Sequence, residues 1–433
     1  MIHRWDFRYS IVKCFVDTAL RINCNKLVIT GKDNIPKDVP IIFTPNHRNA
    51  LIDALLLVYA TPHSKQIVFL GRGDIFKKKF IAWILRGARI IPVFRIRDGK
   101  NNLGRNEEIF ETAAKVLKSN NPIGIFPEAN HNPKQSLLPI KKAVPRIVLP
   151  MEHQYNFELN TNIIPVSIYY TNVAGFLSDC YVHFGEPIKV DNYKEEYNSN
   201  PSVAINKLRA DMETELKKIV VDIWNDEYYD EYYSLVNWKR DTVAKELFPK
   251  EKDATAKAAR HIVREMDNLF HNDREAFDNK IAKIRETNAI LEEHNISNEW
   301  KIEEHTSSSK TTFQSIALWS SSPIALFGFA NCILPIIIQK KLQSLFKDKQ
   351  FISSVRYVAG LFLIPLFAII QSLIVYGVVA DWWVALAYFV AMPSSFLFAV
   401  HWRKWRREIK RVKKVNKFSR HQPLKMEELL NSL

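Results

Sequence analysis

A histidine and a carboxylate stand close together where a predicted strand turns into a predicted helix. The apolar run 41–44 leads into Pro45, His47 follows, and Asp53 lies inside an apolar helical pattern. A carboxylate beside an imidazole fixes its tautomer and stabilises its protonated form. The sequence around them offers no evident serine or cysteine nucleophile. The pair predicts general-base catalysis, in which His47 removes a proton from a substrate hydroxyl and Asp53 orients the ring. The alternative is a purely structural pair.

Further polar residues follow other apolar runs and could bind a substrate. Open α/β sheets bind ligands at the carboxyl ends of their strands, and a phosphate needs charge-assisted hydrogen bonds. Arg95 and Arg97 lie on the same side of a strand end, because side chains alternate with period two, so they could grip one phosphate together. A surface ion-pair role is their alternative, and a solvated helix face is the alternative for Lys141. The candidate substrate-binding residues are Arg95, Arg97, Glu128, His131 and Lys141.

The elements that must position these residues alternate along the chain. Strands alternating with helices predict an α/β domain with a mostly parallel sheet flanked by helices. The expected strands are 26–29, 41–44, 67–70, 90–93, 123–126, 163–170 and 180–184, and the expected helices are 49–59, 76–86, 106–119 and 142–151.

This part of the chain resembles the glycerolipid acyltransferases of the lysophosphatidate acyltransferase type. That family carries four ordered blocks, which stand here as Asn46-His47…Asp53, IPVFRIR, FPEA and IIPV. The five residues between His47 and Asp53, together with Asn49 and His131, are similar to the fungal-type branch that acylates glycerol 3-phosphate or dihydroxyacetone phosphate. The resemblance implies a membrane-bound enzyme of phospholipid biosynthesis. It would transfer a fatty acyl group from acyl-CoA or acyl-carrier protein to a hydroxyl of glycerol 3-phosphate.

The resemblance also implies what individual residues and partners do. Glu128 would contact the glycerol portion of the acceptor, and no metal or cofactor other than the acyl donor would be needed. The family's FPEG glycine is Ala129 here, so we expect the loop after Glu128 to avoid positive φ, which alanine disfavours.

Three alternatives stay open at this point. The acceptor could be lysophosphatidate instead of glycerol 3-phosphate. The chain could be a catalytically silent membrane scaffold that binds lipid without turnover. A metal-dependent hydrolase could use His47, Asp53 and His131, although no HExxH-like pair or dense carboxylate cluster supports it.

Two long uncharged segments predict a helical hairpin through a membrane. Residues 357–380 and 382–400 contain no charged side chain, and about 20 predominantly apolar residues suffice to span a bilayer. The alternative is a buried pair of core helices. A third segment, 316–338, carries two prolines, a glycine and Asn331, which favours a re-entrant element over a straight span.

Basic clusters around these segments set the expected orientation. The loop 340–356 and the tail after residue 402 are rich in Lys and Arg, which prefer the cytoplasmic side. We therefore expect an integral membrane protein with a cytoplasmic catalytic domain, in a bacterial cytoplasmic membrane in preference to the endoplasmic reticulum. Nucleic-acid binding is an alternative for the tail, but anionic lipid explains a basic segment directly after a span. The expected partners are membrane lipids, the acyl donor and the glycerol-phosphate acceptor, with no nucleic acid.

Composition and domain division complete the prediction. A 47% hydrophobic fraction excludes a mainly disordered chain, and four cysteines far apart argue against a disulfide framework or a cysteine zinc site. The N-terminal helix places Ile11, Val12, Phe15, Ala19 and Leu20 on one face, which could pack on a core or lie on a membrane. The predicted regions are an amphipathic helix in 1–25, the α/β domain 26–190, a polar helical region and linker 191–312, a membrane region 313–402 and a basic tail 403–433.

Overall fold

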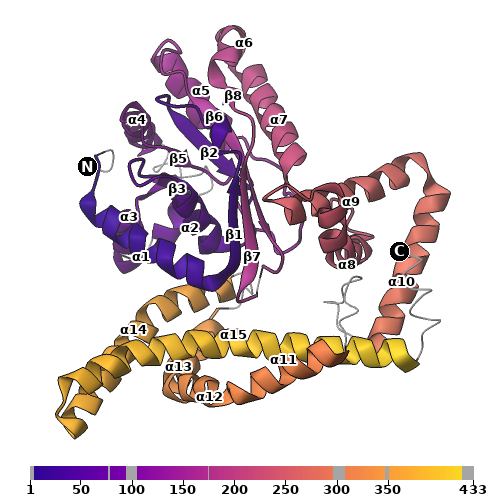
Figure 1. Cartoon of the computed structure of the whole chain (residues 1–433). Coiled ribbons are helices and arrows are strands. Elements are labelled where there is room, and N and C mark those ends of the chain that lie inside the picture. Colours follow the sequence, from indigo (N-terminus) through magenta and orange to yellow (C-terminus); the bar gives the residue numbers. More distant parts are fainter. Residues whose placement is uncertain are drawn as a thin grey trace. The chain divides into compact units, whose positions relative to one another are not determined.

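The computed structural model describes residues 4–76, 79–93, 105–173, 175–295, 308–346 and 351–421. They divide into two compact units, Met1–Trp224 and Asn225–Leu433. The first contains a β-sheet with its helices, and the described part of the second is helical (Figure 1).

The sheet of the first unit is mostly parallel, as predicted. Its strands lie in the order β1-β7-β6-β2-β5-β3-β4, and β8 pairs with β6. The pairs of β6 with β7 and with β8 are antiparallel, and the other pairs are parallel. The strands are β1 (Cys24–Thr30), β2 (Ile41–Pro45), β3 (Val68–Arg72), β4 (Ile90–Val93), β5 (Ile123–Gly124), β6 (Asn162–Tyr170), β7 (Ser178–Phe184) and β8 (Ile188–Lys189).

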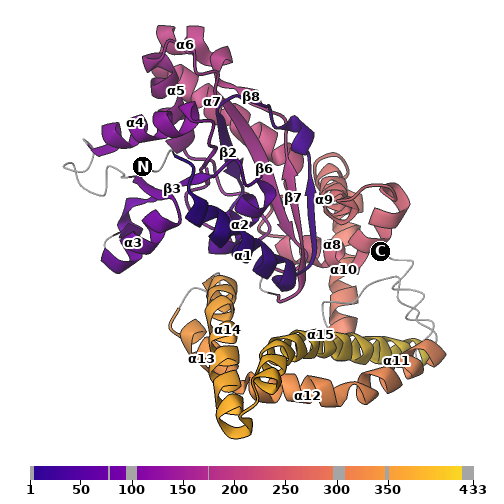
Figure 2. The ribbon, with the colours of Figure 1, turned by 60° about the vertical axis from the view of Figure 1, so that its left-hand side comes forward.

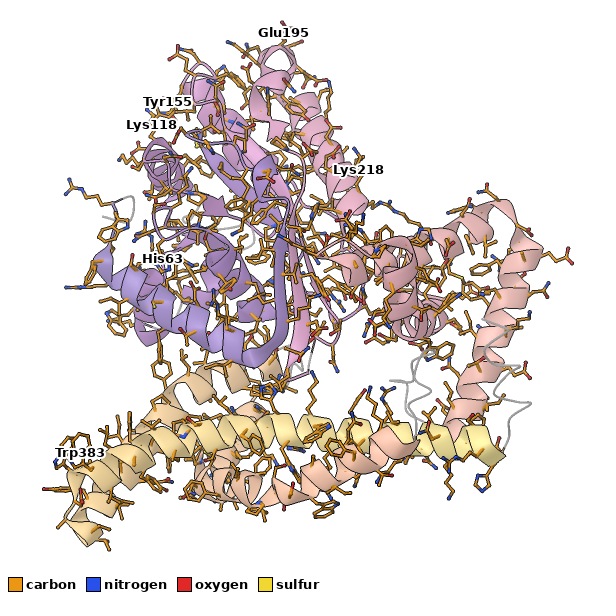
Figure 3. The ribbon with its side chains drawn as sticks, viewed as in Figure 1. His63, Lys118, Tyr155, Glu195, Lys218 and Trp383 are labelled. Atoms are coloured by element: carbon orange, nitrogen blue, oxygen red, sulfur yellow. The ribbon has the colours of Figure 1, made fainter. Side chains whose placement is uncertain are left out.

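Helices flank both faces of this sheet. The α1 and α2 helices lie on one side, and α4, α5 and α7 supply apolar residues to a core on the other (Figure 2). Between α4 and α5, the Lys118 ammonium lies 3.6 Å from the centre of the Tyr155 ring (Figure 3). The helices are α1 (Phe7–Asn23), α2 (Ala50–Ala60), α3 (Lys79–Gly87), α4 (Arg105–Lys118), α5 (Ala143–Gln154), α6 (Lys194–Ser199) and α7 (Pro201–Ile219).

The first unit extends past residue 190, where the sequence places the end of the α/β domain. Ala204, Leu208 and Met212 of α7 join the core that covers the sheet, because apolar residues four apart share one face of a helix. The segment after α7 is also tied to the sheet's loops, since Asp222 accepts a hydrogen bond from the Leu137 backbone N–H at 2.8 Å. The polar region predicted from 191 is therefore divided between the two units.

The buried side of the N-terminal helix α1 contains apolar residues and one lysine, Lys13. Leu20 points into the unit, whereas Ile11 and Val12 are 56% and 59% exposed, so the predicted single apolar face is split. The buried side includes Lys13, whose ammonium donates to Asp17 at 2.8 Å and to the Val58 carbonyl at 2.7 Å. Polar contacts thus hold α1 on the unit while several of its apolar side chains face outward.

The second unit begins with three polar helices and continues with apolar ones. Two of its helices, α14 (29 residues) and α15 (40 residues), are long and apolar enough to cross a membrane. The α15 helix continues without a break from the predicted second span into the basic tail. The helices are α8 (Tyr229–Leu247), α9 (Ala254–Asn272), α10 (Arg274–Glu293), α11 (Ser308–Ser320), α12 (Ser322–Asn331), α13 (Ile333–Ser344), α14 (Phe351–Val379) and α15 (Trp382–His421).

The segment predicted to be re-entrant contains a sharp bend. The α12 and α13 helices meet at 59° around Cys332, a geometry that suits either a broken span or a re-entrant loop, so the re-entrant assignment stays a prediction. Tyr388 of α15 lies within hydrogen-bond distance of Asn331 and Gln371, at 2.6 and 2.9 Å. These bonds satisfy polar groups that an apolar environment would otherwise leave unpaired. The helix α11 starts at Ser308, inside the stretch predicted as a linker.

Candidate active site

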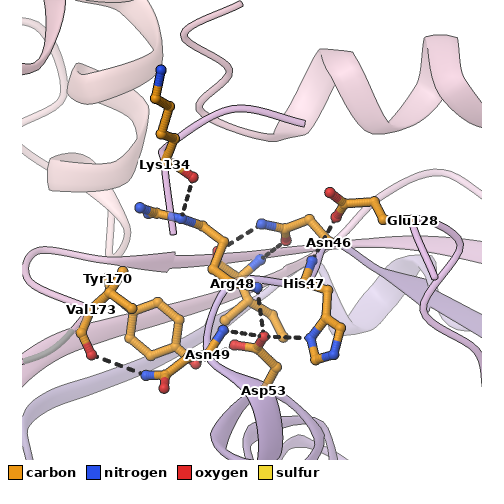
Figure 4. A network of polar contacts seen from close by, with 10 residues as sticks. Asn46, His47, Arg48, Asn49, Asp53, Glu128, Lys134, Tyr170 and Val173 are labelled. Carbon is orange, nitrogen blue, oxygen red and sulfur yellow. Dashed lines mark hydrogen bonds and ion pairs between the residues drawn. The ribbon is translucent and has the colours of Figure 1, made fainter. Parts of the chain in front are cut away.

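The loop after β2 is anchored to the neighbouring strand by Asn46. Its side-chain oxygen accepts the Ile168 N–H at 2.7 Å, and its side-chain nitrogen donates to the Ile168 carbonyl at 3.2 Å (Figure 4). Its own N–H donates to the Val166 carbonyl, which continues the pairing of β2 with β6 by one residue. The next residue, His47, therefore leaves the sheet from a fixed point.

His47 and Asp53 are in direct contact, as the sequence predicts. The His47 Nδ1 lies 2.8 Å from Asp53 Oδ2, and the same oxygen accepts the backbone N–H groups of Arg48 and Asn49 at 2.7 Å each. A carboxylate oxygen accepts only, so the imidazole proton is on Nδ1 and Nε2 is left with a lone pair for a substrate proton. The Asp53 side chain is fully buried, whereas that of His47 is 15% exposed. This geometry can perform general-base catalysis.

Glu128 positions the backbone of the loop after β2, which carries His47. One of its carboxyl oxygens accepts the His47 N–H at 2.7 Å and the other accepts the Leu138 N–H at 2.8 Å. The residue is 1% exposed, and it joins the loop after β2 to the loop after β5. Contact with the glycerol portion of an acceptor, which the resemblance implies, stays a prediction.

The carboxyl group of Glu128 should make stability depend on pH. Burial raises its pKa from 4.5 to about 8, although the Leu138 and His47 N–H groups act in the opposite direction. The folded chain then holds this proton more tightly than the unfolded chain, so the free energy of unfolding falls as pH rises from the lower value to the higher. We expect the gap in unfolding temperature between wild type and Glu128→Gln to shrink from about pH 5.5 to about pH 8.5.

Thermal unfolding of the full chain in detergent measures this gap. Glu152→Gln is the matched control, because Glu152 is a buried carboxyl that accepts the Thr161 N–H outside the site. The Glu152→Gln variant measures how much the replacement of a buried carboxyl by an amide lowers the unfolding temperature outside the site. A gap for Glu128→Gln that stays constant or widens with pH would contradict the raised pKa.

The structure brings His131 to the site as well. The His47 ring stacks on Phe126 with 3.9 Å between ring centres, and the His131 ring meets His47 edge-on at 5.6 Å. The Asn132 N–H donates to the His47 carbonyl at 2.9 Å, so the loop after β5 lies against the loop after β2.

Of the three remaining predicted residues, the structure describes Lys141. The side chain of Lys141 is exposed, and its backbone N–H donates to the Pro127 carbonyl at 2.9 Å, near Glu128. Arg95 and Arg97 lie outside the described residues. Their roles in phosphate binding stay predictions.

Sequence reasoning missed two residues that build the site. Arg48 is buried and donates from Nε to the Lys134 carbonyl (Figure 4). Its Nη2 donates to the Pro133 carbonyl, and the two bonds fix the far part of the loop after β5. Tyr170, at the end of β6, donates its hydroxyl to Asp53 Oδ1 at 2.5 Å. The apolar context of Tyr170 in the sequence predicts a core residue and gives no sign of this bond.

Ala129 corrects an expectation about the loop. Its φ is +60°, so the loop does adopt the left-handed conformation that alanine disfavours. The surrounding contacts impose it, because the Ala129 N–H closes a turn onto the Phe126 carbonyl at 3.1 Å while the carboxyl of Glu128 is held from both sides. The family's glycine would take this conformation without strain.

We therefore expect Ala129→Gly to stabilise the fold. Relief of the left-handed alanine is worth about 1–2 kcal/mol, and the added freedom of glycine in the unfolded chain cancels part of it, which leaves a gain of up to about 1 kcal/mol. Thermal unfolding measures the change. Ala113→Gly inside α4 is the control and should destabilise by about 1 kcal/mol, because glycine is a poor helix former. A lower unfolding temperature for Ala129→Gly would contradict the strain.

Comparisons with known proteins agree with the resemblance seen in the sequence. Residues 26–169 match the family model described as Acyltransferase. Glycerol-3-phosphate O-acyltransferase 2 of Saccharomyces cerevisiae is 24% identical over 46% of this chain and 25% of its own length. The 1-acyl-sn-glycerol-3-phosphate acyltransferase of Borreliella burgdorferi is 26% identical over 38% of this chain and 59% of its own length. That of Cocos nucifera is 28% identical over 46% of this chain and 61% of its own length.

Each of these matches covers less than two thirds of the relative's own length. A crystal structure of the 1-acyl-sn-glycerophosphate (LPA) acyltransferase PlsC from Thermotoga maritima is also similar. It has a TM-score of 0.35 and 19% identity, and the match covers 50% of this chain and 80% of that one. The predicted resemblance to the acyltransferase family is confirmed for residues 26–169.

Proposed function

We propose that this chain, in which residues 26–169 form an acyltransferase-family domain, transfers a fatty acyl group from acyl-CoA or acyl-carrier protein to a hydroxyl of glycerol 3-phosphate. The observation that carries the proposal is the contact of His47 Nδ1 with the buried Asp53 carboxylate at 2.8 Å, which leaves Nε2 available as a base.

The site supports a direct transfer without an acyl-enzyme intermediate. The acceptor hydroxyl gives its proton to His47 Nε2 while its oxygen attacks the thioester carbonyl, and Asp53 stabilises the imidazolium that forms. Collapse of the tetrahedral intermediate breaks the carbon–sulfur bond. The imidazolium then returns the proton to the leaving thiolate, so that the products are an ester and a free thiol.

Lysophosphatidate is the second candidate acceptor, because relatives named for both acceptors match this domain. We favour glycerol 3-phosphate because His131, a feature similar to the fungal-type branch, lies beside His47. In this proposal Arg95, Arg97 and Lys141 hold the phosphate, and Glu128 shapes the pocket for the glycerol portion.

An acceptor panel tests the proposal. The purified full chain in lipid nanodiscs is given labelled acyl-CoA with glycerol 3-phosphate, dihydroxyacetone phosphate or lysophosphatidate, with and without chelator. We expect labelled lysophosphatidate from glycerol 3-phosphate at the same rate in chelator. Faster turnover of lysophosphatidate would reassign the acceptor, loss of activity in chelator would favour a metal-dependent enzyme, and no acyl transfer to any acceptor would favour the silent scaffold.

Membrane lipids are the proposed partner of the outward face of α1. Phe7, Ile11 and Phe15 are 64%, 56% and 48% exposed, and Arg8 and Arg21 are exposed on the same helix. Apolar side chains bordered by cations suit the boundary between acyl chains and anionic headgroups. The same chain carries two helices long and apolar enough to cross a bilayer, which supports the proposal that the protein is bound to a membrane.

A depth measurement tests the α1 contact. Cysteine replaces Ile11 or Phe15 in a background where the exposed Cys14 is serine and the buried Cys24, Cys180 and Cys332 are kept. Each variant is labelled with a fluorophore in liposomes of anionic lipid. We expect nitroxide-labelled lipids to quench the fluorophore at both positions. Lys218→Cys is the control, since its side chain is 59% exposed on α7 (Figure 3). Equal quenching at all three positions, or none at 11 and 15, would exclude a specific contact of α1 with lipid.

A further inference from the structure

Tyr170 reaches the catalytic aspartate from the neighbouring strand. It is the last residue of β6, it is 3% exposed, and its hydroxyl lies 2.5 Å from Asp53 Oδ1 (Figure 4). We propose that Tyr170 is a positioning residue for proton transfer, whose hydroxyl holds the Asp53 carboxylate so that the other oxygen faces His47. This inference rests on the proposed function of the same site.

The two oxygens of Asp53 have separate tasks. Oδ2 accepts the imidazole Nδ1–H and the N–H groups of Arg48 and Asn49, all at 2.7–2.8 Å. Among the described residues, Tyr170 is the donor to Oδ1. Bonds at both oxygens prevent the carboxylate from turning about its Cβ–Cγ bond. Without the hydroxyl, Oδ1 would be buried without a donor, and the carboxylate would turn to share the three remaining donors.

The strand β6 is a rigid support for this contact. Asn46, next to His47, makes two hydrogen bonds to Ile168, which lies two residues before Tyr170. Tyr170 itself is paired with Cys180 in the antiparallel register of β6 and β7. The catalytic loop is thus bridged to one strand at two points, once beside the base and once at its carboxylate.

The phenol stays protonated and able to donate. Burial, and next the Asp53 carboxylate, raises the pKa of Tyr170 well above its ordinary value. The other titratable groups close by are His131 against the His47 ring, Glu128 on the His47 N–H, and the thiols of Cys24 and Cys180 near Tyr170. These groups are kept unchanged in the test.

Tyr170→Phe removes only the hydroxyl, and Tyr193→Phe is a matched control. Tyr193 also donates its hydroxyl to a carboxylate, that of Asp211, at 2.5 Å in the same unit but outside the site. We expect Tyr170→Phe to lower kcat roughly 10- to 100-fold, with both substrate KM values within about threefold of wild type. Tyr193→Phe should keep kcat within about twofold. A kcat for Tyr170→Phe no lower than that of the control would overturn the proposal.

A measurement without turnover separates this inference from the proposed function. Diethyl pyrocarbonate reacts with the imidazole nitrogen that carries a lone pair, so mass spectrometry of the His47 peptide at one fixed pH gives the rate at which Nε2 is modified. If Asp53 Oδ2 no longer holds the Nδ1–H, Nε2 is less often the nitrogen with the lone pair, and the rate should fall severalfold in Tyr170→Phe but not in Tyr193→Phe. An unchanged or higher rate would overturn the positioning role. A wild type without acyl transfer would overturn the proposed function instead, and the modification rate would still test Tyr170.

Discussion

His47→Ala is expected to lower kcat for acyl transfer by about 10²–10⁴-fold while the fold stays intact. The ring supplies a base in contact with the buried Asp53 carboxylate, and alanine cannot accept the proton of the acceptor hydroxyl. The backbone contacts of the loop do not need the ring, because Glu128 accepts the His47 N–H and the Asn132 N–H donates to the His47 carbonyl. Initial rates with labelled acyl-CoA and glycerol 3-phosphate measure the loss.

His63→Ala is the matched control for this variant. His63 also faces a carboxylate, that of Asp17, with 3.6 Å between Nε2 and Oδ2, but its side chain is 53% exposed and lies outside the site (Figure 3). We expect it to keep wild-type rates and the wild-type unfolding temperature. A His47→Ala enzyme that is as active as His63→Ala would exclude general-base catalysis by His47.

The sheet and its helices follow from local patterns, and the departures have non-local causes. The run 90–93 is β4 as predicted, because an apolar run bounded by turns carries its own signal. The run 123–126 forms only two residues of strand, although the Ile125 N–H still donates to the Phe43 carbonyl. The chain then enters the loop in which Glu128 accepts the His47 N–H, a contact 81 residues apart in sequence. The sequence also did not predict that Lys13 lies on the buried side of α1, because one of the groups that pair with its ammonium, the Val58 carbonyl, belongs to α2.

The contacts of the candidate site are likewise of two kinds, local and long-range. His47 and Asp53 are six residues apart, so their contact is within the reach of spacing arguments. Tyr170 is 117 residues from Asp53, and Glu128 is 81 residues from His47, so these contacts depend on which strands become neighbours. A sequence pattern of period two places Tyr170 on a face of β6 but does not say that β2 lies beside it. Hydrogen-bond partners across the sheet are therefore what the sequence could not supply.

Asp53→Asn separates the charge of the aspartate from its shape. The amide oxygen can take the place of Oδ2 and accept from the imidazole, Arg48 and Asn49. The amide nitrogen can take the place of Oδ1, because the Tyr170 hydroxyl is able to accept a hydrogen bond as well as donate one. The loop geometry should survive this substitution, so the unfolding temperature should stay within a few degrees of the wild-type value.

The activity of Asp53→Asn should nevertheless fall by about 10²–10⁴-fold in kcat, because the imidazolium formed in the transition state loses its counter-charge in a buried site. Asp211→Asn is the control: it changes the other tyrosine–aspartate bond of the same length, and we expect full activity. Steady-state rates and thermal unfolding of both variants decide the matter. If Asp53→Asn turns over within a few-fold of wild type, Asp53 only shapes the loop. If it unfolds far more easily than Asp211→Asn, the amide has not been accommodated, and the loss of activity must then be measured in Asp53→Asn combined with the stabilising Ala129→Gly.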